Sequence, residues 1–249
     1  MTGGGIRLGR GEVWEERGRF MSNGVMVKEA PWRSGVRSAR ANLLPGFVLQ
    51  VAALALVLAY YRHEPTRAAL GRIVAWREEA GVVLSIVSTG FFGGLLPMLY
   101  LWMRRATCGM FSVGQAAVIT AFWAYKGFEV DLLYRLLARF VGEGHDVRTI
   151  AIKTVIDQFV YCPLIAVPVT VLLYEWVTAR FDAGAVKADL RAGGWVRRRV
   201  VPVLISNVGV WLPAVCIIYA LPTALQLPLQ NLVLCFFTLL VAHQTRRAD

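Results

Sequence analysis

The sequence predicts an all-α fold, a polytopic transmembrane helical bundle of four to six spans with proline-broken C-terminal helices. Hydrophobic residues make up 57% of the 249 residues and charged residues 17%, whereas soluble domains are about 45–50% apolar and about 25% charged. The hydrophobic residues gather in blocks, several of which approach the roughly 20 residues that a helix needs to cross a bilayer. Short strands of alternating hydrophobicity, which are typical of membrane barrels, do not occur in the sequence.

Composition divides the chain into two regions. Residues 1–41 are rich in Gly and Arg, and we expect a basic, loosely ordered N-terminal tail there. This segment has no apolar core, which argues against a cleavable signal peptide, and its glutamates argue against a transit peptide. Residues 42–245 are predicted to form the transmembrane helical bundle. The apolar blocks of this region are residues 43–61, 80–103, 111–125, 150–177, 200–222 and 224–243.

Small residues recur along the block 80–103. Ser85, Thr89 and Gly93 follow one another at every fourth position, and Gly90 forms a GxxxG pair with Gly94. Such spacing lets two helix backbones approach closely in lipid, where dispersion contacts then hold them together. We therefore predict that this helix packs tightly against a neighbour within the bundle.

Residues 127–140 are amphipathic. Asp131, Arg135 and Arg139 line one helical face at i, i+4 spacing, and an acid that precedes a base in this way favours an ion pair along a helix. Apolar residues such as Leu133 lie on another face. We expect this segment to be either the end of a span or a helix that lies in the headgroup layer.

The block 150–177 carries the candidate functional residues. It reads IAIKTVIDQFVYCPLIAVPVTVLLYEWV, which places Lys153, Asp157 and Tyr161 on one helical face with Gln158 beside them. A carboxylate deep in a membrane span costs about 2.5–3.5 kcal/mol on insertion scales, so it usually faces a partner or water. One interpretation is structural, a Lys153–Asp157 pair or an interhelical hydrogen bond that fixes the register of the bundle. The other is functional, the polar wall of a water-filled path or a gate, with Lys153, Asp157 and Gln158 as the candidate pore or gate residues.

Prolines recur through the apolar sequence after residue 200. Pro202, Pro213, Pro222 and Pro228 alternate there with polar residues such as Asn207. Interrupted membrane helices expose backbone carbonyls, and such breaks are tolerated where they are buried in protein or line a cavity. The pattern therefore indicates either ordinary proline kinks or the lining of a solute path.

Motifs of enzymes and of nucleic-acid modules are missing from the sequence. It contains no P-loop, GxSxG or HExxH pattern, and its three histidines lie in separate segments. The net charge of +11 fits basic loops beside membrane spans, because basic residues with aromatic neighbours are too sparse for a nucleic-acid module. The four cysteines lie in or beside apolar blocks without a CxxC pair, and we expect them to be packing residues. The sequence thus predicts no enzymatic activity, no cofactor, no metal site and no nucleic-acid partner.

Several residues together match two motifs of a known group of membrane proteins. The motifs read G-P-x-x-H-x-W-Y-x-x-L followed by K-x-x-x-D-Q-x-x-x-x-P, and then N-W-x-V-W-P followed by V-P. The matching residues are Gly127, Tyr134, Leu137, Lys153, Asp157, Gln158, Pro163, Asn207, Val210, Trp211, Pro213 and Pro222. On these residues the chain resembles the Mpv-seventeen/peroxisomal membrane protein family, over about residues 104–243. It departs from the first motif at Phe128 and Asp131, where the family has Pro and His.

This resemblance implies a multi-pass α-helical protein with no known enzymatic step. Members of the family have been proposed to form weakly selective channels. We therefore expect a weakly selective channel or a small-solute permeation protein, with the alternative of a structural or scaffolding membrane protein without transport activity. The resemblance makes Lys153, Asp157 and Gln158 the pore or gate candidates and the other matching residues structural. The expected partners are the lipid bilayer and small solutes, and the chain could form a homo-oligomer. The Ala- and Arg-rich composition favours a bacterial inner membrane, with a mitochondrial, peroxisomal or plastid membrane as the alternative.

Overall fold

The apolar blocks of the sequence form helices, and three of these helices are long and apolar enough to cross a membrane. They are Val82–Met103, Val147–Thr178 and Val196–Tyr219. The computed structural model describes residues 33, 36–37, 40, 43–105 and 107–244, without the side chains of residues 45 and 237–244. Within these ranges the backbone is helical apart from short connections and contains no strand, which confirms the predicted all-α class. Most of the predicted N-terminal tail, 1–41, lies outside the described residues.

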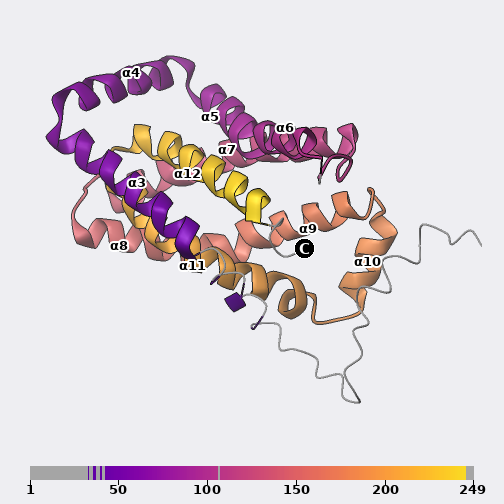
Figure 1. Cartoon of the computed structure of the whole chain (residues 1–249). Helices are drawn as coiled ribbons and strands as arrows, with labels where there is room; N and C mark the ends of the chain where they lie inside the picture. Colours follow the sequence, from indigo (N-terminus) through magenta and orange to yellow (C-terminus); the bar gives the residue numbers. More distant parts are fainter. Residues whose placement is uncertain (1–32, 34–35, 38–39, 41–42, 106, 245–249) are drawn as a thin grey trace, which may run out of the picture. The chain divides into compact units, whose positions relative to one another are not determined.

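The chain bends sharply between its first two long helices. α3 (Leu43–Arg62) and α4 (Glu64–Ala80) meet at an angle of 101° (Figure 1). His63 lies at the bend and begins α4, because its ring accepts a hydrogen bond from the backbone N–H of Thr66. If the bent pair counts as one span, the described chain has up to four membrane-crossing helices. The predicted four to six spans therefore agree with the structure only at the lower limit.

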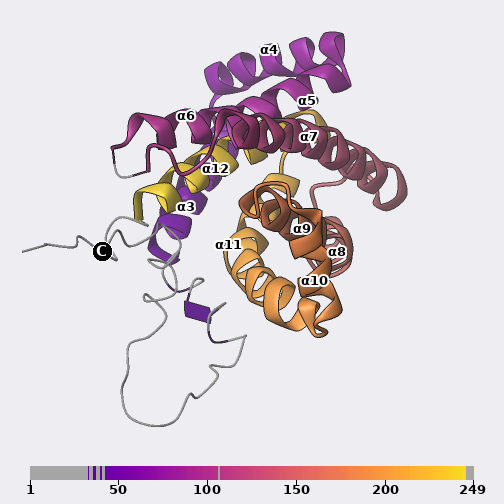
Figure 2. The ribbon, with the colours of Figure 1, turned by 90° about the vertical axis from the view of Figure 1, so that its right-hand side faces the viewer.

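The second apolar block packs tightly on the helix that follows it. α5 (Val82–Thr89), η1 (Gly90–Leu95) and α6 (Leu96–Met103) continue one another, and α5 and η1 contact α7 (Val113–Val141) (Figure 2). A Cβ atom built on Gly94 would lie 2.6 Å from the Cα of Thr120, and one on Gly90 would lie 3.0 Å from the Cβ of Ala124. The helix backbones thus touch where side chains are missing, which confirms the close approach predicted from the GxxxG pair.

α7 joins two segments of different composition. One helix of 29 residues runs through the apolar block 111–125 and the amphipathic segment 127–140, so the amphipathic segment is the end of a longer helix. A capping box at Ser112 begins this helix, and Gly142, with φ 111°, ends it. Gly127 does not interrupt the helix. It lies where α5 packs closely against α7, and the missing side chain leaves room for the backbone of Ser85.

The span that carries the candidate residues contains widened turns in its middle. α8 (Val147–Ile156) leads into the π-helical segment η2 (Asp157–Ala166), which is followed by α9 (Val167–Thr178). Pro163 lies inside η2 and supplies no backbone N–H for an α-helical hydrogen bond. The wider π turns take up this proline without ending the helix, and π turns of this kind recur at functional sites.

Two of the C-terminal prolines do not break their helices. After α10 (Ala183–Arg191) and η3 (Val196–Val200), α11 (Val201–Tyr219) runs through Pro213 and α12 (Thr223–Gln244) runs through Pro228. The prediction of proline-broken helices is therefore wrong at these two positions. Pro222 does mark a break, because it lies in the short connection between α11 and α12. Pro202 occupies the first turn of α11, where its missing N–H costs little.

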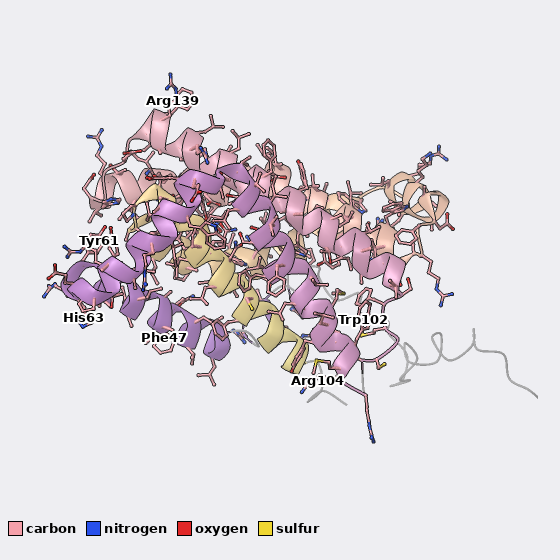
Figure 3. All side chains as sticks on the ribbon, turned by 90° about the horizontal axis from the view of Figure 1, so that it is seen from above. Phe47, Tyr61, His63, Trp102, Arg104 and Arg139 are labelled. Atoms are coloured by element: carbon pink, nitrogen blue, oxygen red, sulfur yellow. The ribbon has the colours of Figure 1, made fainter. Side chains whose placement is uncertain are left out.

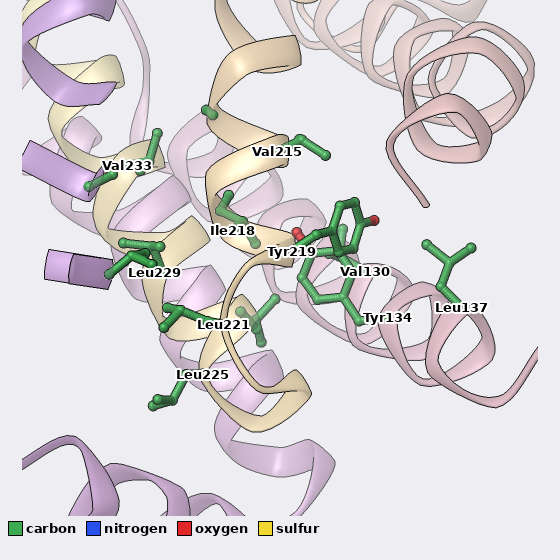
Figure 4. Close-up of a cluster of buried hydrophobic side chains, with 14 residues drawn as sticks. Val130, Tyr134, Leu137, Val215, Ile218, Tyr219, Leu221, Leu225, Leu229 and Val233 are labelled. Atoms are coloured by element: carbon green, nitrogen blue, oxygen red, sulfur yellow. The ribbon is translucent and has the colours of Figure 1, made fainter. Parts of the chain in front are cut away.

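A cluster of buried side chains joins α3, α7, α11 and α12 (Figure 4). Tyr134 of α7 and Tyr219 of α11 meet there edge to face, with ring centroids 5.5 Å apart. The other side of α3 is exposed and apolar, and Phe47 projects outward from it (Figure 3). An outward apolar face is expected of a helix that contacts lipid.

Candidate functional site

The candidate site is a cavity of about 230 Å³ between the middle of α7, the segment η2 with the start of α9, and the helices α11 and α12. Most of its wall surface is apolar, although about half of the lining residues carry a polar or charged group. The polar or charged lining residues are Thr89, Lys126, Tyr134, Asp157, Gln158, Tyr161, Cys162, Thr170, Asn207 and Gln230. A largely apolar cavity wall on which polar groups converge is typical of small-molecule sites.

Asp157 lies at the start of η2 and is only 5% exposed. Its Oδ2 accepts a 2.7 Å hydrogen bond from the hydroxyl of Tyr219, and its Oδ1 accepts one of 3.1 Å from Nε2 of Gln158. The thiol of Cys162 lies 3.5 Å from Oδ1 and donates to it as well. The acid therefore has protein partners on both oxygens, and one of them comes from a different helix.

Gln158 is buried beside Asp157, and its two polar ends differ. Its Nε2 donates to Asp157 and contacts Cys162 Sγ at 3.7 Å, whereas its Oε1 has no hydrogen-bond partner among the described residues. Asn207 of α11 reaches the same sulfur with its Nδ2, also at 3.7 Å. A buried acceptor without a donor costs about 1–3 kcal/mol, so a polar occupant of this region would relieve Gln158.

A second group of charged residues lies on the α7 side of the cavity. Lys126 Nζ lies 2.5 Å from Glu129 Oε1 and 3.1 Å from the hydroxyl of Tyr161. Tyr161 in turn donates to Oε1 of Glu129. Lys126 and Glu129 are not among the candidate residues predicted from the sequence. The only signal for them in the sequence is their i, i+3 spacing. Tyr161, which bonds both of them, lies 35 residues after Lys126.

Lys153 does not join the cavity. It is 1% exposed, lies in α8 one turn before Asp157, and places its Nζ 5.9 Å from the ring centroid of Tyr219. No ion pair joins Lys153 and Asp157 in the described part of the chain. The predicted Lys153–Asp157 pair is therefore wrong, whereas Tyr219 makes the kind of interhelical hydrogen bond that the structural interpretation named as its other form.

The other residues of the two motifs fall into lining, packing and backbone positions. Tyr134, Asn207 and Trp211 line the cavity. Leu137 belongs to the buried cluster, and Gly127 lies against α5. The remaining motif prolines, Pro163, Pro213 and Pro222, lie in η2, in α11 and before α12.

The polar groups that line the cavity are donors and acceptors of hydrogen bonds. The described residues contain no group of three or more His, Cys, Asp and Glu side chains that could hold a metal ion. The cavity instead offers Lys126 as a donor, Asp157 as an acceptor and the free oxygen of Gln158. Comparisons of the chain with protein-family models, with curated proteins and with solved structures gave no match.

Proposed function

We propose that this chain is a multi-pass integral membrane protein whose helices form a transmembrane bundle, and that the cavity beside Asp157 provides a weakly selective path for small solutes. The observation that supports this most directly is the burial of Lys126, Asp157 and Gln158 around one cavity of about 230 Å³. Polar and ionisable residues inside membrane proteins are costly, and they characteristically face a cavity, a solute path or a partner.

The setting of the cavity supports this proposal. Two of its walls belong to the helices Val147–Thr178 and Val196–Tyr219, which are long and apolar enough to cross a membrane. Widened turns in η2 set the polar residues at the cavity, and irregular backbone at membrane depth is tolerated where it lines a cavity. Asp157 and Gln158 are the proposed path residues, with Lys126 in place of Lys153 as the cation.

Membership of the Mpv-seventeen/peroxisomal membrane protein family is part of the same proposal, and so is a bacterial inner membrane as the location. The family assignment rests on the motif residues that the sequence matches. Tyr134, Asn207 and Trp211 come from two helices and line the cavity together with Asp157 and Gln158.

A liposome experiment with a matched pair of variants tests the path. Thr170 of α9 lines the cavity, and within the described part of the chain its hydroxyl bonds the carbonyl of Ala166 one turn earlier, so Thr170→Trp fills the cavity without breaking a hydrogen bond to another span. Val169 is its neighbour, is partly exposed and does not line the cavity, which makes Val169→Trp the control. We expect release of small trapped solutes from liposomes that contain the native protein or Val169→Trp, and reduced release with Thr170→Trp. Release no faster than from empty liposomes would refute the proposal.

One observation favours a second candidate, a structural or scaffolding membrane protein. The two oxygens of Asp157 are satisfied by Tyr219, Gln158 and Cys162, as expected of a residue that fixes helix packing. Asp157→Asn separates the candidates, with the exposed carboxylate variant Glu79→Gln as the control. Altered solute release from a folded Asp157→Asn protein supports the path. Unfolding of the Asp157→Asn protein, together with no solute release by the native protein, supports the scaffold.

A further inference from the structure

A second cavity, of about 300 Å³, lies between α3, α4, α5 and α12. Its wall consists almost entirely of apolar side chains. The lining residues on α12 and its preceding turn include Leu221, Leu225 and Leu229, which Figure 4 shows on the side of the buried cluster away from Tyr134. A cavity of about 150 Å³ with such a lining stays dry and takes up apolar molecules, so this cavity is large enough for part of a hydrocarbon chain.

The two polar side chains of this wall are already satisfied. Asn231 Nδ2 donates a 3.0 Å hydrogen bond to Ser88 Oγ, and Asn231 Oδ1 accepts one of 2.9 Å from Thr89. A buried water needs about two to four polar partners, and this wall has no unsatisfied group to offer among the described residues. An apolar occupant therefore fits the cavity better than water or a polar solute.

The cavity reaches the surface of the helices. Trp76 of α4 is 59% exposed and Leu232 of α12 is 43% exposed, and both are lining residues. α4 is far more polar than the helices around it and follows the sharp bend at His63. Tryptophan on such a helix is typical of the zone between hydrocarbon and headgroups, which is where the chains of a phospholipid begin.

One cation of α4 is available beside this mouth. Arg77 is paired with Asp131, and Arg67 donates to the backbone carbonyls of Tyr60 and Tyr61. Arg72 lies one helical turn before Trp76, is exposed, and makes no hydrogen bond or ion pair with the described part of the chain. A guanidinium at this position complements a phosphate group.

We propose that this cavity binds one acyl chain of a phospholipid whose phosphate lies against Arg72. The site is separate from the cavity beside Asp157 and does not depend on solute permeation. It differs from ordinary lipid contact because the chain enters between helices instead of lying along their outer faces, so the lipid should stay bound when bulk lipid is removed.

The test measures phospholipid retained by the purified full-length protein after exchange into lipid-free detergent, by native mass spectrometry. Leu84 lines the cavity and Leu84→Trp fills it, whereas the adjacent Val83 is exposed and lines no part of it, which makes Val83→Trp the matched control. We expect stoichiometric retention by the native protein and by Val83→Trp, and loss of retention in Leu84→Trp. Leu232→Trp provides a second filling variant at a more exposed position, in case Leu84→Trp does not fold.

Arg72→Gln tests the headgroup part of the proposal. Loss of the charge-assisted hydrogen bond should weaken phospholipid retention about tenfold while leaving retention of an uncharged alkyl detergent unchanged. Retention that falls equally for both molecules, or that persists in both filling variants, would overturn the assignment. So would a native protein that emerges from exchange without phospholipid.

Discussion

The hydroxyl of Tyr219 on α11 donates a 2.7 Å hydrogen bond to Oδ2 of Asp157 on η2, so the carboxylate of one candidate span is held by a side chain of another. The two residues are 62 positions apart in the sequence. Tyr219 also stacks edge to face on Tyr134 of α7 (Figure 4). The acid is thereby tied to two further helices through one aromatic side chain.

Tyr219→Phe should destabilise the protein by about 1–3 kcal/mol, because it removes a donor from a buried carboxylate while keeping the ring contact. Unfolding in mixed detergent micelles measures this loss. Tyr61→Phe is the control, since the Tyr61 hydroxyl bonds the carbonyl of Ala220 at an exposed position where water can replace it. Equal losses in the two variants would contradict the special role of the Tyr219–Asp157 bond.

Gly127→Ala should destabilise the helix pair α5 and α7. The added Cβ would lie 2.2 Å from the backbone oxygen of Ser85 and 2.8 Å from the Cβ of Thr89, so the backbones would have to separate. We expect a loss of about 1–3 kcal/mol, typical of overpacking. Gly114→Ala in the same helix has only the Ser112 hydroxyl within 4 Å, at 3.9 Å, and should be neutral or stabilising by up to about 1 kcal/mol. Similar unfolding curves for both variants would mean that the close approach is not tight.

Arg77→Met should cost about 3–5 kcal/mol, the loss expected when one partner of a buried ion pair is removed. Arg77 pairs with buried Asp131 and donates to the carbonyls of Thr223 and Ala224 at the start of α12. Arg135 pairs with the same carboxylate at 2.7 Å, but its side chain is 55% exposed. Arg135→Met should therefore cost at most about 1 kcal/mol. The ratio of the two losses, measured by unfolding, checks the assignment of Arg77 as the buried partner.

The sequence predicted the parts of this architecture that depend on local patterns. The GxxxG pair at Gly90 and Gly94 indicated the close helix contact, and the i, i+4 spacing of Asp131 and Arg135 indicated their ion pair. Each of the two signals lies within a single helix, so the spacing of the residues along the chain is enough to detect it.

The candidate site was predicted only in part, because its partners come from separate helices. Asp157 and Gln158 do line the cavity, but the sequence could not show that Tyr219 holds the acid in place of Lys153. Lys126 was missed for the same reason, since its position at the cavity depends on how α7 packs against η2. Contacts between distant segments follow from packing, and a periodic pattern within one helix does not contain them.

Asp189 should make stability depend on pH at the connection between the last two candidate spans. Its carboxylate accepts hydrogen bonds from Arg199 Nε at 3.0 Å and from Arg198 Nη2 at 2.9 Å. The bond from Arg199 is the main cause that holds the pKa of Asp189 below its usual value, against an opposing effect of desolvation. A carboxylate whose pKa is lower in the folded state stabilises that state above its unfolded pKa, about 3.9, and loses this contribution as the pH falls through the folded pKa.

The difference in unfolding temperature between the native protein and Asp189→Asn should therefore be constant above about pH 5 and should shrink below about pH 4. Glu79→Gln serves as the control, because Glu79 is exposed and makes no hydrogen bond or ion pair with the described part of the chain. Its difference from the native protein should stay small throughout. The difference in unfolding temperature between the native protein and Asp189→Asn could instead stay the same down to about pH 2. That result would mean that the two arginines do not lower the pKa of this carboxyl group in the folded protein, because its protonation would then not destabilise the native state.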